Sequence, residues 1–166
     1  IKSLMRDQVQ ELNLVGITRV DALTSESSAA EKAEIMRRFS RGQLLFLLVS
    51  PERFQVPEFR DTVRALQGSA QIAHGVVDEV HCLSEWGHDF RVSYLNLAAT
   101  MAALSPTALF LGLTATASVN VLRDIQIEFK VSEEDVCYRL DFERPELAFE
   151  VVPEREGKLA TLRDLV

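Results

Sequence analysis

Val76-Val77-Asp78-Glu79-Val80-His81 is the stretch around which this chain is organised. An apolar, strand-like run ends here in two adjacent carboxylates. Such a pair suits a magnesium-nucleotide site, in which the first carboxylate holds Mg²⁺ through water and the second orients and polarises an attacking water. A strand that ends in solvated acids has the same pattern, so the pair alone leaves both interpretations open.

The apolar run before Asp78 is one of three that predict buried strands. They are residues 44–49, 72–77 and 108–113. Their near-continuous apolar character is typical of strands covered on both faces. Residues 58–66 and 94–104 predict crossover helices between them, and this alternation indicates an α/β domain with a parallel sheet.

Each predicted strand is followed by polar residues. These are Ser50-Pro51-Glu52-Arg53, Asp78-Glu79 and Thr114-Ala115-Thr116. Because open α/β sheets bind ligands at the carboxyl ends of their strands, the three clusters predict one functional edge.

Other segments have clear signals of secondary structure. Ile1, Leu4, Met5, Val9 and Leu12 share one helical face. Ser28 and Glu31 form the pattern of a capping box, which predicts a helix that runs to about residue 39 and stops at Gly42. Residues 136–152 contain two strand-like stretches, and residues 157–166 predict a helix that leads out of the domain.

Bulk composition fits one globular domain. The chain has 166 residues, of which 47% are hydrophobic and 26% charged. Apolar stretches reach only about six residues where a membrane span needs about 20, which predicts a soluble protein. Because the chain starts with Ile1, we expect a segment trimmed from a longer protein. Cys82 and Cys137 lie far apart, so we expect two reduced, buried thiols and no zinc site.

The net charge of −7 opposes a broad nucleic-acid-binding face. Its distribution is uneven, because residues 1–60 carry 9 Lys/Arg against 8 Asp/Glu while the remainder carries 9 against 17. A nucleic-acid surface is therefore expected to be local and assembled from loops.

The segment from Asp78 to Arg91 resembles the RecQ family of helicases very closely. It reads Asp-Glu-Val-His-Cys-Leu-Ser-Glu-Trp-Gly-His-Asp-Phe-Arg, which is similar to the family's Walker B box running into its aromatic-rich loop. Four other segments resemble further family motifs in the family's order. They are residues 3–8 (motif Ia), 49–54 (motif Ib), 113–117 (motif III) and 142–147, which is similar to the end of the first motor lobe.

This resemblance implies a RecA-like lobe at residues 1–156, followed by the start of a connection to a second lobe at 157–166. It implies an ATP- and Mg²⁺-dependent DNA helicase with 3′-to-5′ polarity that acts in repair and recombination, located in the bacterial cytoplasm or the eukaryotic nucleus. Asp78 would hold Mg²⁺, Glu79 would activate water, and His81 would contact the motif III residues Thr114 and Thr116. A satisfied core histidine is the alternative for His81.

DNA contacts are expected from residues of three motifs. Trp86, His88 and Phe90 offer flat faces for stacking on bases, with the cation of Arg91 nearby, although Trp86 and Phe90 could instead pack in the core. Further candidates are Ser3, Lys2, Arg6 and Arg53. A solvated helix face for Lys2 and Arg6, and a surface ion pair with Glu52 for Arg53, are the alternatives.

The chain also departs from the family pattern. It contains no G-x-x-x-x-G-K-[ST] phosphate loop. We therefore expect the isolated chain to lack ATPase activity, and expect an exposed sheet edge along residues 108–113 that favours self-association. Val80, Glu85, Val92 and Ser93 replace the family's usual Ala, Gln, Pro and Glu. A non-catalytic nucleic-acid-binding module remains an alternative, whereas a metal-dependent hydrolase using Asp78, Glu79 and His81 lacks the spaced ligands of a closed metal site.

Overall fold

The computed structural model describes residues 2–66, 72–84, 91–94, 96–137, 147–148 and 151. The chain divides into two compact units, residues 1–135 and residues 136–166. The helices and strands described below belong to the first unit. The predicted strands at 136–152, the motif at 142–147 and the exit helix at 157–166 lie almost entirely outside the described residues, so these and the domain limits remain predictions.

The described strands form two parallel pairs. β1 (Val20–Leu23) pairs with β2 (Phe46–Val49), and β3 (His74–Val77) pairs with β4 (Leu109–Gly112). In the second pair Val77 lies opposite Gly112, so the two strands end at the same level. The predicted parallel α/β organisation is confirmed.

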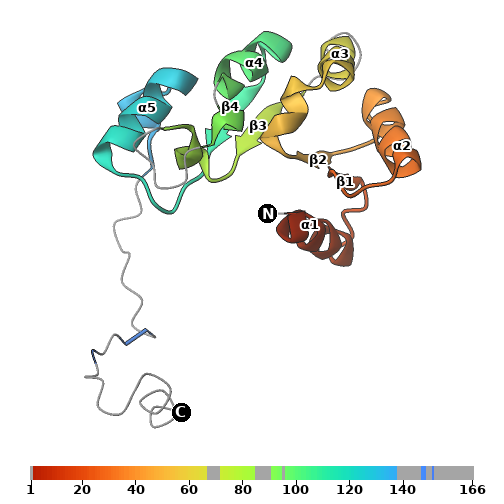
Figure 1. The fold of residues 1–166 in the computed structure, drawn as a ribbon, viewed down its shortest axis with the longest axis horizontal. Helices are drawn as coiled ribbons and strands as arrows, with labels where there is room; N and C mark the ends of the chain where they lie inside the picture. The colour runs from red at the N-terminus through yellow and green to blue at the C-terminus, as the bar shows by residue number, and fades with distance from the viewer. Residues whose placement is uncertain are drawn as a thin grey trace. The chain divides into compact units, whose positions relative to one another are not determined.

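Helices connect these strands. They are α1 (Lys2–Leu14), α2 (Ala29–Ser40), α3 (Pro57–Leu66), α4 (Leu97–Leu104) and α5 (Val119–Phe129). Four short 3₁₀ turns are η1 (Pro51–Gln55), η2 (Val80–Leu83), η3 (Val92–Tyr94) and η4 (Glu133–Asp135). Within this unit α1 lies on one side of the strands, and α2 to α5 follow one another along the other side (Figure 1).

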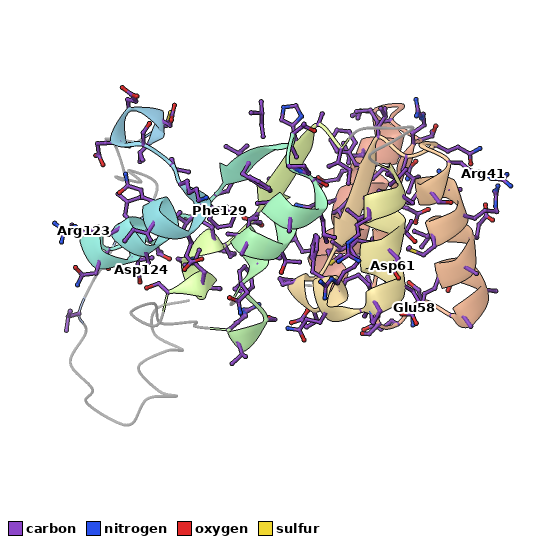
Figure 2. All side chains as sticks on the ribbon, turned by 90° about the horizontal axis from the view of Figure 1, so that it is seen from above. Arg41, Glu58, Asp61, Arg123, Asp124 and Phe129 are labelled. Carbon is purple, nitrogen blue, oxygen red and sulfur yellow. The ribbon has the colours of Figure 1, made fainter. Side chains whose placement is uncertain are left out.

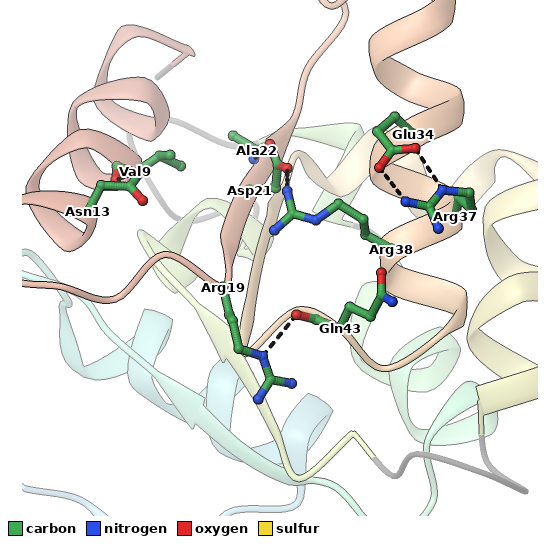
Figure 3. Close-up of polar contacts among 9 residues, drawn as sticks. All are labelled: Val9, Asn13, Arg19, Asp21, Ala22, Glu34, Arg37, Arg38 and Gln43. Atoms are coloured by element: carbon green, nitrogen blue, oxygen red, sulfur yellow. Dashed lines mark hydrogen bonds and ion pairs between the residues drawn. The ribbon is translucent and has the colours of Figure 1, made fainter.

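α2 is fixed by its own sequence and by one ion pair. The predicted capping box is present, because Glu31 N–H donates to Ser28 Oγ at 3.2 Å and Ser28 N–H donates to Glu31 Oε2 at 2.7 Å. These bonds satisfy two N–H groups that a bare helix start would leave without partners. Near the other end, Arg38 reaches Asp21 of β1 at 2.6 Å (Figure 3). The ion pair joins the helix to the strand that it covers.

Two apolar clusters form the core of the first unit. The first joins Val77, Val80 and Cys82 to α4, Tyr94 and α5, and Phe110 packs on it. The second joins Leu23 and Ile35 to α3 and Leu104. A fully buried Leu, Ile or Phe side chain contributes about 1.5–3 kcal/mol. These clusters therefore hold the strand ends in place.

One face of the β3–β4 pair differs from the prediction. The strands were expected to be covered on both faces, yet Val76, Leu109 and Leu111 are more than half exposed. The opposite face is packed so closely that a Cβ on Gly75 would lie 2.5 Å from Met101 Cε of α4. The open face has a simple cause, because the helices packed on this pair, α4 and α5, both lie on the other side (Figure 1).

The sequence analysis did not identify β1 and α5. β1 is short and carries a charged residue, Asp21, in its centre, which hides its strand character. α5 did have a signal: Ser118 Oγ accepts the Val121 N–H, and Val121 and Ile125 recur at helical spacing on its buried face.

The prediction for Cys137 was wrong. Cys82 is buried in the first cluster, but Cys137 is exposed. It lies two residues after the acidic turn η4, outside both apolar clusters. In the part of the chain that the structure describes, no helix has the length and apolar character needed to cross a membrane.

Candidate active site

The carboxylates Asp78 and Glu79 form the turn that follows β3. Both are exposed, and Glu79 has a left-handed backbone with φ 50°. This conformation costs a residue with a side chain roughly 1–2 kcal/mol. The turn is held because Val80 N–H donates to Leu113 O and Leu113 N–H donates to Val77 O, each at 2.9 Å. β4 thus supports the strained turn beyond the end of the strand pair.

Val80, which replaces the family's usual Ala, is directed into the core and not toward the carboxylates. Its side chain is buried in the first cluster. A Cβ on Gly112 would lie only 3.2 Å from Val80 Cγ1. The larger side chain at position 80 therefore fills the space that a glycine leaves on β4.

His81 joins the acidic turn to the loop after β4. Its Nδ1 lies 2.9 Å from Thr114 Oγ1 and 3.3 Å from Glu79 Oε2. The histidine side chain is 9% exposed and that of Glu79 is 54% exposed. Thr114 Oγ1 also accepts the Thr116 N–H at 3.2 Å. The predicted polar contact between His81 and the Thr114–Thr116 loop is confirmed.

His81 Nδ1 is the ring atom that faces both Glu79 and Thr114. The other ring nitrogen, Nε2, lies 3.9 Å from Cys82 Sγ. The buried ring thus connects one carboxylate oxygen of Glu79 to Thr114, while more than half of the Glu79 side chain remains exposed.

The donor set at this edge suits a hard cation held mainly through water. Asp78 and Glu79 supply exposed carboxylate oxygens, the ligands that Mg²⁺ prefers. Among the described residues no group of three or more His, Cys, Asp or Glu side chains is placed to enclose a metal ion. Mg²⁺ bound with a nucleotide needs few protein ligands, because phosphates and water complete its shell.

Residues 85–90 lie outside the described residues, and the predicted stacking side chains Trp86, His88 and Phe90 are among them. The described chain resumes at Arg91, beside the acidic turn. Arg91 N–H donates to Cys82 O at 2.9 Å, so position 91 lies beside η2. Ser84, which is 1% exposed, donates its hydroxyl hydrogen to Asp124 of α5. Figure 2 shows Asp124 on that helix, where Arg123 points outward.

The turn η3 then approaches the acidic residues. Tyr94 O–H donates to the backbone carbonyl of Asp78 at 3.3 Å. Burial raises the pKa of Tyr94, and the nearby Cys82, Asp78 and Glu52 raise it further against the opposing effect of Arg91. The phenol therefore stays protonated and remains a donor. Tyr94 was predicted only to begin the helix at residues 94–104 and was assigned no role, because no local pattern pairs it with Asp78.

Glu52 connects η1 to η3. Partial burial alone would raise its pKa, but hydrogen bonds from its own backbone N–H, Ser50 and Ser93 outweigh burial and lower the pKa of this carboxyl. Arg91 lowers the pKa further by its charge. Glu52 is thus engaged with Ser50, Ser93 and Arg91, and the predicted alternative of a pair with Arg53 is not the arrangement found.

The remaining candidates for DNA contact fall into two groups. Ser3 and Arg6 are exposed on α1, and Arg6 pairs with Glu26 at 2.7 Å with both side chains about half exposed. Arg53 in η1 and Arg91 before η3 are half-buried. Arg53 and Arg91 adjoin the acidic turn through η3. Ser3 and Arg6 lie on α1, which packs against β1.

The chain is similar to known helicases. Residues 1–125 match the DEAD/DEAH box helicase family. The chain is 36% identical over 150 residues to an ATP-dependent DNA helicase RecQ of Bacillus subtilis (strain 168). The matched segment covers 90% of this chain and 24% of that protein. It is 32% identical over 163 residues to the RecQ-like DNA helicase BLM of Xenopus laevis, covering 96% of this chain and 12% of that protein. The chain thus spans about a quarter or less of these relatives.

Proposed function

The chain belongs to the DEAD/DEAH box helicase family, and from this premise we propose that it contributes the water-activating part of the ATP site of a RecQ-type DNA helicase. The observation that carries the proposal is the contact chain Glu79–His81–Thr114 at the carboxyl ends of β3 and β4. It places a water-accessible carboxylate in contact with the loop that would report nucleotide state.

Each residue of the turn has a separate role in this proposal. Asp78 holds Mg²⁺ through water, and Glu79 orients the water that attacks the γ-phosphate. Mg²⁺, when bound with ATP, neutralises charge on the phosphate oxygens. His81 keeps the Glu79 carboxylate in one orientation and couples it to Thr114 and Thr116. The buried ring suits this task because it cannot swing into solvent.

DNA is the proposed polymer substrate, unwound with 3′-to-5′ polarity in repair and recombination. Arg53 and Arg91 adjoin the hydrolytic turn, and Ser3 and Arg6 on α1 would provide a second phosphate contact. Stacking by Trp86, His88 and Phe90 remains part of the proposal. The family and the RecQ relatives support DNA as the partner.

ATPase measurements on the full-length protein that contains this chain test the proposal. We expect hydrolysis that single-stranded DNA stimulates, and a loss of about 10²–10⁴-fold in Glu79→Gln, the range for removal of a positioned proton acceptor. Glu34→Gln is the matched control, because Glu34 is an exposed carboxylate on α2 that pairs only locally with Arg37. Wild-type-like hydrolysis by Glu79→Gln would show that the water is activated elsewhere.

The isolated 166-residue chain is proposed to be inactive, because its sequence contains no phosphate loop to hold the β and γ phosphates. Phosphate release by the purified chain, stimulated by DNA, would contradict this.

The predicted sheet edge along residues 108–113 is the basis of the proposal that the isolated chain self-associates, and the open face of the β3–β4 pair supports it. Leu109 and Leu111 are exposed on β4, and exposed apolar strands favour pairing between chains. Light scattering should show a mass that rises with concentration, and Leu111→Lys should suppress the rise. A constant monomer mass would refute association.

A further inference from the structure

The peptide bond between Asp78 and Glu79 is held on both sides. Its carbonyl oxygen accepts the Tyr94 O–H at 3.3 Å, and its N–H donates to Asp78 Oδ1 at 2.9 Å. The first contact is remote in sequence and comes from η3. The second is local and forms within the turn. The Tyr94 contact therefore ties the orientation of this peptide to another element.

The orientation of this peptide helps to hold the Asp78 carboxylate, because Asp78 Oδ1 accepts the peptide N–H. Glu79 has a left-handed backbone, which residues with a side chain rarely adopt unless their surroundings impose it. Rotation of the Asp78–Glu79 peptide would change the φ of Glu79 and break the bond from its N–H to Asp78 Oδ1, which holds the Asp78 carboxylate. A donor that holds the carbonyl opposes this rotation directly.

Tyr94 is well suited to hold the peptide. Tyr94 is 9% exposed and packs in the cluster that contains Val77 and Val80, the residues that flank the acidic pair. A buried phenol has only two side-chain torsions, and both are fixed by this packing. The hydroxyl position is thus determined by the core and not by a flexible surface chain.

The same turn is connected to the candidate DNA contacts. Tyr94 N–H donates to Arg91 O, and Arg91 N–H donates to Cys82 O, each at 2.9 Å. η3 also contacts η1, which carries Arg53. A ligand that shifts residues 91–94 would therefore move the phenol relative to Asp78.

We propose that Tyr94 is a positioning residue whose hydroxyl holds the Asp78–Glu79 peptide in the orientation needed for hydrolysis and transmits displacement of residues 91–94 to it. This inference rests on the proposed ATPase function. We assign this role to the hydroxyl and not to the ring, because a phenylalanine ring would pack in the core equally well.

The test compares Tyr94→Phe with Met101→Ala in the full-length protein. Tyr94→Phe removes one hydrogen bond and keeps the buried ring, so we expect DNA-stimulated kcat to fall roughly fivefold, KM for ATP to stay within about twofold, and the melting temperature to move by no more than about 4 °C. Met101→Ala loosens the same cluster and leaves the hydroxyl in place. It should lower the melting temperature more and leave kcat at 20 °C unchanged.

A second readout does not depend on hydrolysis. Tyr94→Phe should speed hydrogen exchange at the Glu79 and Val80 amides relative to wild type, and Met101→Ala should not do so selectively. Wild-type kcat and exchange in Tyr94→Phe, or an equal kcat loss in both variants, would overturn the positioning role. An inactive wild-type protein would refute the proposed function, and the exchange comparison would then decide the role of Tyr94 separately.

Discussion

Replacement of Thr114 by valine isolates the contact on which the candidate site depends. Valine keeps the branched shape of threonine and removes only the hydroxyl, which lies 2.9 Å from His81 Nδ1 and 3.2 Å from the Thr116 N–H. The loss of these two hydrogen bonds differs in energetic cost. Thr116 is exposed, so water can replace its lost acceptor, whereas His81 is 7% exposed and its Nδ1 would keep one polar neighbour among the described residues, Glu79 Oε2 at 3.3 Å.

The cost of this change follows from that difference. One net hydrogen bond contributes about 0.5–1.5 kcal/mol, so Thr114→Val should lower the free energy of unfolding by about 1 kcal/mol. If the same contact holds Glu79 during hydrolysis, an equal loss in the transition state lowers DNA-stimulated kcat roughly fivefold. Thr114→Ser restores the hydroxyl and should recover most of the rate.

Steady-state ATPase assays with saturating single-stranded DNA, together with urea unfolding of the same proteins, check both numbers. The valine variant should lose rate, and the serine variant should retain at least half of it. The reasoning is refuted if valine and wild type hydrolyse ATP at the same rate, or if serine is as slow as valine, because then the hydroxyl is not the group that matters.

Three further predictions concern the framework of the site. Gly75→Ala should cost about 1–3 kcal/mol in urea unfolding, because the new Cβ would lie 2.5 Å from Met101 Cε, and Gly75→Ala with Met101→Ala should recover part of it. Asp21→Ala should cost about 1–2 kcal/mol, because it leaves the partly buried Arg38 without its ion-pair partner; a cost under about 0.3 kcal/mol would contradict this. Glu31→Ala should lower the melting temperature at pH 7. The capping bond lowers the folded-state pKa of this carboxyl, so its contribution is complete above the unfolded value of 4.5 and should vanish as pH falls through the lower folded value.

Much of the framework followed from local sequence patterns. The apolar runs before Asp78 and Thr114 predicted β3 and β4, and the Ser28–Glu31 pattern predicted the start of α2. Such signals are local, because strand hydrophobicity and helix capping depend on residues a few positions apart. β1 was missed for the opposite reason. Asp21 sits in its centre, and only its ion pair with Arg38, 17 residues away, explains a charge there.

The features of the candidate site also fall into those that the sequence predicted and those that only the structure showed. The sequence alone determined that two carboxylates follow an apolar strand, and the family resemblance already indicated the contact between His81 and Thr114. Only the tertiary structure determined the left-handed turn at Glu79, the Tyr94 bond to the Asp78 carbonyl and the open face of the β3–β4 pair. The physical reason is that these features depend on the strand register, which places Val77 opposite Gly112, and on the packing of η3 on the core. Which loops meet is set by the pairing of whole strands and by the core between them, and no spacing along the chain encodes that.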